Sequence, residues 1–205
     1  TGGSQNTAVG GEALDANSTG NYNTAVGRNA LTSNTTASSN SALGTAALQE
    51  NTTGDSNTAI GAFALDANTT ASHNTAIGRN TLTANTSGTR NVAVGNYALE
   101  SNTTANDNIA IGYEALEDNT TATRNVAVGN YALDEHTTGD YNVAIGYNSL
   151  TRDTDGTKNT AVGDSSLAYN TTGASNTAVG QGCLLYNTTA SNNTAIGQDA
   201  LKQNT

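Results

Sequence analysis

A 17-residue period runs through the whole chain and constrains its fold more than any other feature. Counted from Asn6, asparagine recurs every 17 residues as far as Asn193, without an insertion or deletion. The 205 residues therefore hold twelve tandem copies of one unit. Short units of this kind stack so that each contacts only its neighbours, which predicts an elongated array. We interpret residues 1–205 as a single repeat array, and as a fragment of a longer fibre.

The unit has the consensus Asn-Thr-Ala-Val-Gly-x-x-Ala-Leu-x-x-Asn-Thr-Thr-Gly/Ala-x-x. We call each set of equivalent residues, spaced by 17, a column, and name it after its first member. The columns of Ala8, Gly10 and Leu14 are invariant in all twelve copies. The Val9 column contains only Val, Ile or Leu. Such regularity at every copy indicates a stacked structure in which equivalent residues meet.

A second asparagine column begins at Asn17. It holds asparagine in ten of the twelve copies, and His136 and Asp153 are the two substitutes. Threonine pairs usually follow this column, and a Gly or Ala comes next. Asparagine and glycine both tolerate the left-handed backbone conformations that tight turns require, so we expect turns at these residues.

The distribution of charge separates the inside of the array from its surface. Seven columns across the twelve copies hold 84 positions, and none of these positions is charged, although 12% of the chain is. All 24 charged residues fall in other columns, which we take as the solvent face. The seven uncharged columns are those of Asn6, Thr7, Ala8, Val9, Gly10, Ala13 and Leu14.

The first five residues of the unit, Asn6 to Gly10, read as a β-strand that ends at a glycine. Neighbouring residues in a strand point to opposite faces, so Ala8 faces one way and Thr7 and Val9 face the other. Both faces lack charge, and a strand that is apolar on both faces is normally buried on both. Ala8 can face the inside of a coil that Leu14 closes. The other face needs a partner, and self-association is the simplest way to supply one.

Helical repeats are the main rival architecture. Thr-Thr, Asn and Gly recur too often for that, and 17 residues fall short of the common helical repeat lengths. We predict an all-β fold: a parallel β-solenoid or β-roll of twelve 17-residue coils, each with two short strands and two tight turns. At about 4.8 Å per coil, asparagine side chains would stack into ladders along the axis. The strand and core residues that we expect include Asn6, Ala8, Val9, Gly10, Leu14, Asn57, Ala59, Ile60, Gly61, Leu65, Ala110, Ile111, Gly112 and Leu116.

The motif Asn-Thr-Ala-Ile-Gly followed by Ala-Leu resembles the head repeats of trimeric autotransporter adhesins, the YadA-like family. It is also similar to Asn-Thr-rich arrays of phage tail fibres and other bacterial fibrous proteins. The resemblance covers the whole chain, and Asn6–Gly10 and its equivalents match the inner-strand motif of the family. It implies a left-handed roll, three chains around one axis and a place on a cell or virion surface. The adhesin repeat is usually shorter, and the Asn-Thr-Thr-Gly/Ala segment here resembles an enlarged outer turn.

Asparagines followed at the second position by Ser or Thr are candidate N-glycosylation sites in a secreted protein. The alternative is that Asn and Thr only build a turn and a ladder. We favour the alternative, because the Asn6 column is just as regular without forming acceptor sites. Asn192 is one further candidate outside the column. The candidates within the column are Asn17, Asn34, Asn51, Asn68, Asn85, Asn102, Asn119, Asn170 and Asn187.

Few single residues are candidates for catalysis, metal binding or ligand contact. His73 and His136 lie in different columns, and we expect both at the surface and not in a metal site. Cys183 replaces an alanine in a small column and should be a packed thiol. Aspartate occupies no fixed column, so the pattern of calcium-binding β-rolls is missing. The outer columns hold tyrosines that form either a contact stripe for sugars or proteins, or only separately exposed side chains: Tyr97, Tyr113, Tyr131, Tyr147, Tyr169 and Tyr186.

These patterns favour a structural fibre segment that binds copies of itself, and the resemblance implies that the segment is extracellular, structural or adhesive, and forms a homotrimer or fibril. A host-surface or glycan receptor is a further expected partner. The net charge of −10 disfavours nucleic acid, and no apolar run approaches the about 20 residues needed to enter a bilayer. We expect no enzyme activity and no cofactor. A phage tail-fibre spacer is the alternative, and an ice-binding solenoid is a weaker one, because the adjacent threonines Thr35 and Thr36 point to opposite faces.

Overall fold

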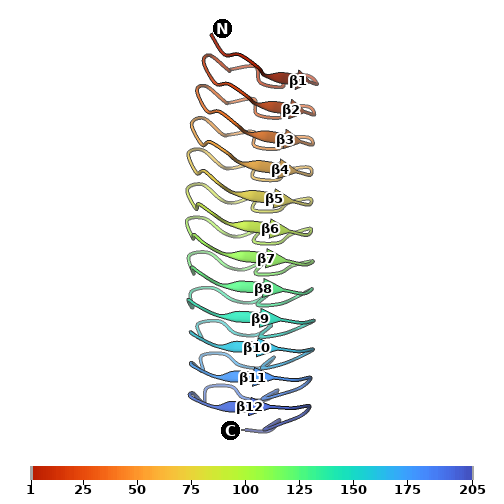
Figure 1. Ribbon diagram of the computed structural model, residues 1–205, viewed down its shortest axis with the longest axis vertical. Coiled ribbons are helices and arrows are strands. Elements are labelled where there is room, and N and C mark those ends of the chain that lie inside the picture. The colour runs from red at the N-terminus through yellow and green to blue at the C-terminus, as the bar shows by residue number, and fades with distance from the viewer. Residues whose placement is uncertain (1, 205) are drawn as a thin grey trace.

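The computed structural model describes residues 2–204, which form one elongated stack of coils (Figure 1). Each coil contributes one three-residue strand that begins at the Thr7 column and ends at the Val9 column. The strands are β1 (Thr7–Val9), β2 (Thr24–Val26), β3 (Ser41–Leu43), β4 (Thr58–Ile60), β5 (Thr75–Ile77), β6 (Val92–Val94), β7 (Ile109–Ile111), β8 (Val126–Val128), β9 (Val143–Ile145), β10 (Thr160–Val162), β11 (Thr177–Val179) and β12 (Thr194–Ile196).

All twelve strands form one parallel sheet in chain order from β1 to β12. Each strand pairs with the next without any shift, so that Thr7 lies opposite Thr24 and Val9 lies opposite Val26. The sheet runs the length of the molecule, and the two chain termini lie at opposite ends (Figure 1). The predicted parallel β-solenoid is thereby confirmed.

The predicted coil of two strands is wrong in detail, because each coil has one strand and this strand is shorter than the five residues from Asn6 to Gly10. The Gly10 column turns the chain out of the strand with φ between 125° and 143°. The columns of Glu12 and Leu14 then adopt left-handed conformations, which leaves no second extended run. Backbone hydrogen bonds still join the coils in this region, for example from the Leu31 N–H to the Ala47 oxygen at 3.0 Å.

Leucine, and not asparagine, supplies one of the main left-handed turns. Every member of the Leu14 column has φ between 47° and 55°, whereas the Asn6 and Asn17 columns have no positive φ within residues 2–204. A left-handed conformation costs a non-glycine residue about 1–3 kcal/mol. The leucine side chains between Leu31 and Leu184 are fully buried, and such burial contributes about 1.5–3 kcal/mol per leucine. Packing in the core therefore offsets the cost of this turn.

The invariant Gly10 column has a steric explanation. A Cβ atom on Gly61 would lie 2.3 Å from the carbonyl oxygen of Gly78 in the next coil. The φ of Gly61 is also 139°, a value that side chains disfavour. Glycine is thus required where successive coils touch backbone to backbone.

The core is narrow and consists of the Ala8, Ala13 and Leu14 columns together with the two asparagine columns, those of Asn6 and Asn17. The predicted core residues Asn57, Ala59, Leu65, Ala110 and Leu116 are all fully buried. Their counterparts in the first coil are more exposed, because only one coil stacks against it.

The polar residues that replace alanine in the Ala13 column find hydrogen-bond partners in the core. Cys183 is a buried free thiol whose sulfur lies 3.1 Å from the carbonyl oxygen of Ala195. The hydroxyls of Ser149 and Ser166 make the equivalent hydrogen bonds in their coils. The prediction of a packed thiol is confirmed.

Candidate functional site

Two asparagine ladders fill the polar side of the core. In the Asn6 column, the Asn57 N–H donates to Asn40 Oδ1 at 2.9 Å, and Asn57 Nδ2 donates to the Ala71 oxygen at 2.8 Å. In the Asn17 column, Asn68 Nδ2 donates to Asn51 Oδ1 at 2.8 Å and to the same Ala71 oxygen at 3.0 Å. The predicted ladders are therefore present, and they join each coil to the one before it.

The candidate glycosylation residues belong to this interior ladder. Asn34 Nδ2, the atom to which an N-linked sugar would be attached, donates to Asn17 Oδ1 at 2.9 Å and to the Ala37 oxygen at 3.1 Å. All nine candidates in the column are buried, whereas Asn192 is exposed. The geometry favours the turn-and-ladder interpretation for Asn17, Asn34, Asn51, Asn68, Asn85, Asn102, Asn119, Asn170 and Asn187.

The predicted surface position of His136 is wrong. His136 and Asp153 occupy the Asn17 column and therefore point into the core, where both are fully buried. His136 Nδ1 lies 3.2 Å from Asp153 Oδ2 and 3.1 Å from the Asp153 carbonyl oxygen, and Nε2 contacts the Gly139 oxygen. The expectation that every charge lies on the solvent face also fails at Asp153. His73, in contrast, is exposed as predicted.

Both ring nitrogens of His136 face acceptors, so only the protonated imidazolium can donate to all of them. Burial lowers the pKa of His136, but the hydrogen bond and the charge of Asp153 outweigh it and hold that pKa above its usual value. Burial raises the pKa of Asp153 as well, against the opposing effect of His136. The pair interrupts the ladder, because Asn119 Oδ1 is buried without the donor that a regular asparagine would provide.

A second surface of interest is the outward strand face, which we define as the columns of Thr7 and Val9. It runs across all twelve strands and carries no charge. Its β-branched residues remain partly exposed in the single chain, at 38% for Ile60 and 39% for Ile111. The Ala8 column faces the core, as predicted, so the strand is covered on one face only.

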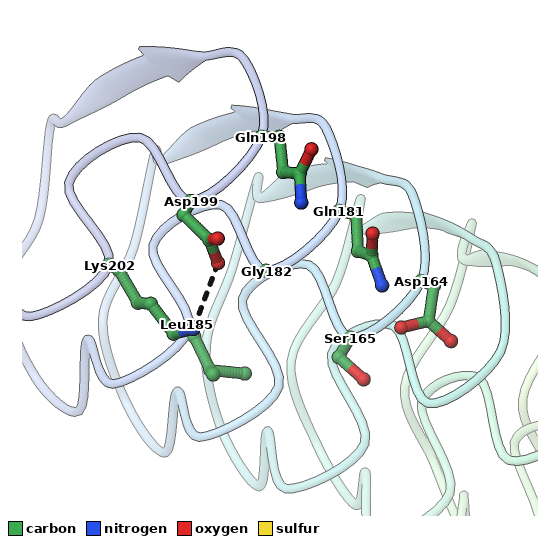
Figure 2. Close-up of a pocket in the computed structure, with 8 residues that line it drawn as sticks. All are labelled: Asp164, Ser165, Gln181, Gly182, Leu185, Gln198, Asp199 and Lys202. Atoms are coloured by element: carbon green, nitrogen blue, oxygen red, sulfur yellow. Dashed lines mark ion pairs between the residues drawn. The ribbon is translucent and has the colours of Figure 1, made fainter.

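A third surface is an axial groove that runs beside the sheet. One wall consists of the columns of Gly11 and Glu12, and the other consists of the columns of Asp15 and Ala16. The two residues between these walls, in the columns of Ala13 and Leu14, point into the core and leave the surface hollowed. Figure 2 shows the groove in the last coils, where Lys202 on one wall and Asp199 on the other form an ion pair at 2.9 Å.

Tyrosines line much of this groove, and the structure brings together residues that the sequence only placed in outer columns. Tyr97, Tyr113, Tyr131 and Tyr147 come from four successive coils and alternate between the two columns of one wall. Their rings meet edge to face, with centroids 5.6–5.9 Å apart. Such contacts are favourable for aromatic pairs. The tyrosines thus form a continuous stripe.

On the opposite wall, Tyr169 and Tyr186 lie with ring centroids 5.1 Å apart. The guanidinium of Arg152 lies 4.6 Å from the centre of the Tyr169 ring, which places a cation against the aromatic face. Aromatic surface therefore lines both sides of the groove.

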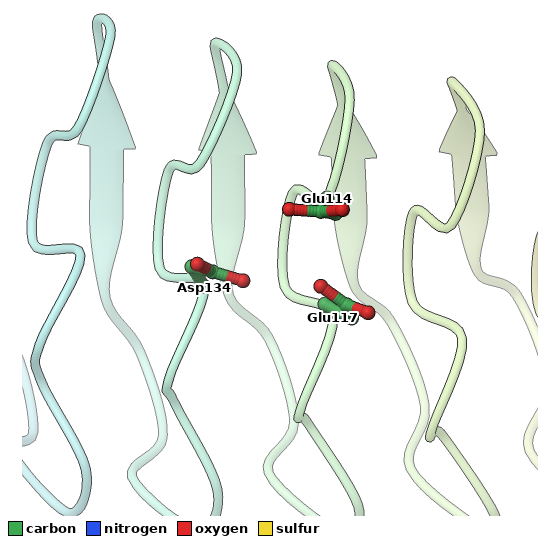
Figure 3. Close-up of side chains that lie close together, drawn as sticks. All are labelled: Glu114, Glu117 and Asp134. Atoms are coloured by element: carbon green, nitrogen blue, oxygen red, sulfur yellow. The ribbon is translucent and has the colours of Figure 1, made fainter.

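Three carboxylates crowd the groove beside the tyrosine stripe (Figure 3). Glu114, Glu117 and Asp134 have carboxylate oxygens within 4.8 Å of one another. Partial burial and the neighbouring negative charges raise the pKa of Glu117 to about 7 and that of Asp134 to about 6. A hydrogen bond to Glu114 raises the pKa of Tyr113 to about 12. The cluster therefore retains a proton near neutral pH, which relieves the repulsion between its members.

Comparison of the chain with protein-family models, with curated proteins and with solved structures gave no match. The resemblance of the motif to adhesin head repeats thus stays a prediction. Within residues 2–204, no helix has the length and apolar composition required to cross a membrane.

Proposed function

We propose that this β-solenoid is a segment of an extracellular fibre, a shaft or adhesive head, that associates with copies of itself through the outward strand face. The single observation that carries the proposal is the absence of charge on this face at all twelve strands, combined with its partly exposed Val, Ile and Leu side chains. A row of exposed aliphatic side chains without charge is the kind of surface that marks interaction sites in soluble proteins.

The length of the face supports association along the whole array. At a rise of about 4.8 Å per coil, twelve strands extend over about 57 Å. In the middle of the array, the threonine of the Thr7 column is replaced by Val92, Ile109, Val126 and Val143, which makes the face most apolar there. Identical chains in the same register would pair identical residues, so one repeat can build an interface of any length.

The resemblance to trimeric adhesin repeats supports three copies around one axis, a left-handed roll and a place on a cell or virion surface. A rigid rod of this kind separates whatever lies at its two ends. A spacer in a phage tail fibre is the alternative with the same architecture. Immunogold labelling of intact cells or particles tests the location. We expect label on intact surfaces, and label that appears only after lysis would contradict it.

Light scattering on the purified chain tests self-association. We expect a mass of three times the chain mass of 20.6 kDa, independent of dilution over a wide range. The double substitution Ile111→Lys and Ile145→Lys places two charges on the outward strand face and should reduce the mass to that of one chain. Thr104→Lys, at an exposed position away from this face, is the matched control and should leave the mass unchanged. A stable folded single chain without substitutions would contradict the proposal.

A further inference from the structure

The axial groove is continuous over the coils that follow β8 to β12. It contains three hollows of about 300, 280 and 260 Å³. The first two share Asn148, Thr151 and Arg152, and the last two share Ser165 and Leu185. Ligand pockets usually measure about 300–1,000 Å³. One hollow is at the lower limit of this range and the other two are below it, but together they make a channel along the axis that fits a linear molecule.

The walls of this channel carry both aromatic and polar groups, and the aromatic residues change from one wall in the first hollow to the other wall in the second. Tyr131 and Tyr147 flank the first hollow, and Tyr169 and Tyr186 flank the second. Two of these rings are the most open to solvent, with 51% of Tyr147 and 44% of Tyr186 exposed. Solvent-exposed aromatic side chains offer flat apolar area together with a hydroxyl that forms hydrogen bonds.

The polar groups between the rings include both donors and acceptors. Asn148 offers both kinds at the junction of the two hollows, Arg152 offers donors, and the carboxylates of Asp134 and Glu135 offer acceptors. Charges of both signs occur along the channel, so it does not select a strongly charged ligand. A matching ligand is uncharged, has flat apolar faces and carries hydroxyls around its rim.

We infer that the axial groove between Tyr131 and Tyr186 binds a linear, uncharged oligosaccharide. The apolar C–H faces of its sugar rings would pack on the more exposed Tyr147 and Tyr186, and its hydroxyls would bond to Asn148, Arg152 and the carboxylates. The channel extends over successive coils, each about 4.8 Å along the axis, so a longer chain of sugars meets more of its lining. The affinity should therefore rise with the length of the oligosaccharide.

An extended peptide fits the groove less well. Peptides that add to a sheet need unpaired backbone groups at an edge, and the backbone here is already paired between coils. The Ser165 N–H donates to the Tyr147 oxygen at 2.8 Å, and the Arg152 N–H donates to the Ala168 oxygen at 3.1 Å. A nucleic acid is disfavoured by the net charge of −10.

The groove consists of columns that do not belong to the outward strand face. The inference therefore goes beyond the proposed fibre function and does not depend on the number of chains. Light scattering reports the association of chains, whereas calorimetry with sugars reports the groove, so the two can fail separately.

Isothermal titration calorimetry of the full chain tests the inference. The probes are the disaccharides and hexasaccharides of β-1,4-linked glucose, β-1,4-linked N-acetylglucosamine and α-1,4-linked glucose, at millimolar concentrations. We expect at least one series to bind, and its hexasaccharide to bind more tightly than its disaccharide. Tyr147→Ala and Tyr186→Ala should each weaken this binding about tenfold, the loss expected for one aromatic contact with its buried area.

Tyr141→Ala is the matched control, because Tyr141 is 47% exposed in the same part of the array but lies outside the groove. It should leave the affinity unchanged, and circular dichroism should show all three variants folded. The failure of all six probes would overturn the inference, as would binding that survives both groove substitutions. Binding of a pool of linear hexapeptides in place of the sugars, lost in the same two variants, would assign the groove to peptides and would overturn it too.

Discussion

The Asn17 column contains a regular stretch and an interruption, and the contrast shows what holds the coils together. From Asn34 to Asn119, each side-chain amide donates to the previous asparagine and to a carbonyl in its own coil. At His136 and Asp153 a buried ion pair replaces two amides. The two regions have the same backbone register, so the path of the coil does not depend on asparagine alone.

The difference between the two regions is one of electrostatics. Asparagine is both donor and acceptor, so identical amides can satisfy one another without any net charge. His136 and Asp153 place an ion pair in the core, which costs desolvation energy, and Asp153 Oδ2 has no hydrogen-bond partner although it lies 3.2 Å from His136 Nδ1. They also leave the Asn119 oxygen without a partner. The interruption should therefore be the part of the ladder that is most sensitive to substitution and to pH.

Removal of one member of the His136–Asp153 pair should have the largest effect on the free energy of unfolding. Asp153→Ala removes the charged partner of the buried His136 and one of the two acceptors of Asn170 Nδ2. We expect a loss of about 3–5 kcal/mol, as for other buried ion pairs that lose one partner. Urea unfolding monitored by circular dichroism measures it. The exposed Asp164→Ala is the control, with an expected change within about 0.5 kcal/mol. Equal effects of the two substitutions would show that the pair is not a stabilising contact.

Truncation of an asparagine in the regular stretch of the ladder should destabilise the chain somewhat less. Asn68→Ala removes the hydrogen bonds to Asn51 and Ala71, leaves Asn51 Oδ1 without this donor, and leaves the Asn85 amide with the Gly88 oxygen as its one remaining acceptor. We expect a loss of about 2–4 kcal/mol from these unsatisfied groups. The same unfolding measurement applies, and the exposed Asn130→Ala should cost under about 1 kcal/mol. If Asn68→Ala proves as mild as Asn130→Ala, the ladder contributes little to stability.

Replacement of the buried ion pair by two asparagines should increase the free energy of unfolding. The double substitution His136→Asn and Asp153→Asn restores asparagine at both positions and provides a donor for the Asn119 oxygen. We expect stabilisation of about 1–3 kcal/mol at neutral pH, because uncharged replacements of a buried ion pair are often more stable. The double variant and the original chain are compared by urea unfolding. A double variant that is less stable would mean that the ion pair fits this core better than asparagine does.

The smallest expected effect is on the pH dependence of stability, which should differ between the ion pair and the regular asparagine ladder. The pKa of His136 in the folded chain lies above its usual value of 6.5, because of the hydrogen bond and charge of Asp153. The resulting stabilisation is fully present below pH 6.5 and is lost as the pH rises through the folded pKa. The advantage of the repaired double variant should therefore widen between pH 6 and pH 9. An advantage that stays constant over this range would contradict a protonated His136.

The sequence predicted the stack, the pairing of like residues and the asparagine ladders, because a strict 17-residue period makes equivalent residues neighbours. It did not predict the left-handed conformation of the Leu14 column, since leucine rarely adopts it and only burial in the core compensates the cost. The expected surface position of His136 is wrong because its column was taken as solvent-facing. The column, which is otherwise buried asparagine, carried the correct signal.

The groove could also not be predicted from the sequence alone. Tyr147 and Tyr169 come from different columns, and only the turns at the Glu12 and Leu14 columns place them on opposite walls of one channel. The exposed strand face, in contrast, followed directly from the alternation of side chains along the strand. It is the feature on which the account of a self-associating fibre depends.

Thiol labelling measures the burial of that face most directly. In a Cys183→Ser background, which the serines of the same column make acceptable, Ile111→Cys places a thiol on the outward strand face and Thr104→Cys places one elsewhere on the surface. We predict that the Ile111→Cys thiol reacts much more slowly than the Thr104→Cys thiol in the assembled protein, and at a comparable rate after unfolding in urea. Equal rates in the folded protein, together with a mass of 20.6 kDa, would contradict the account.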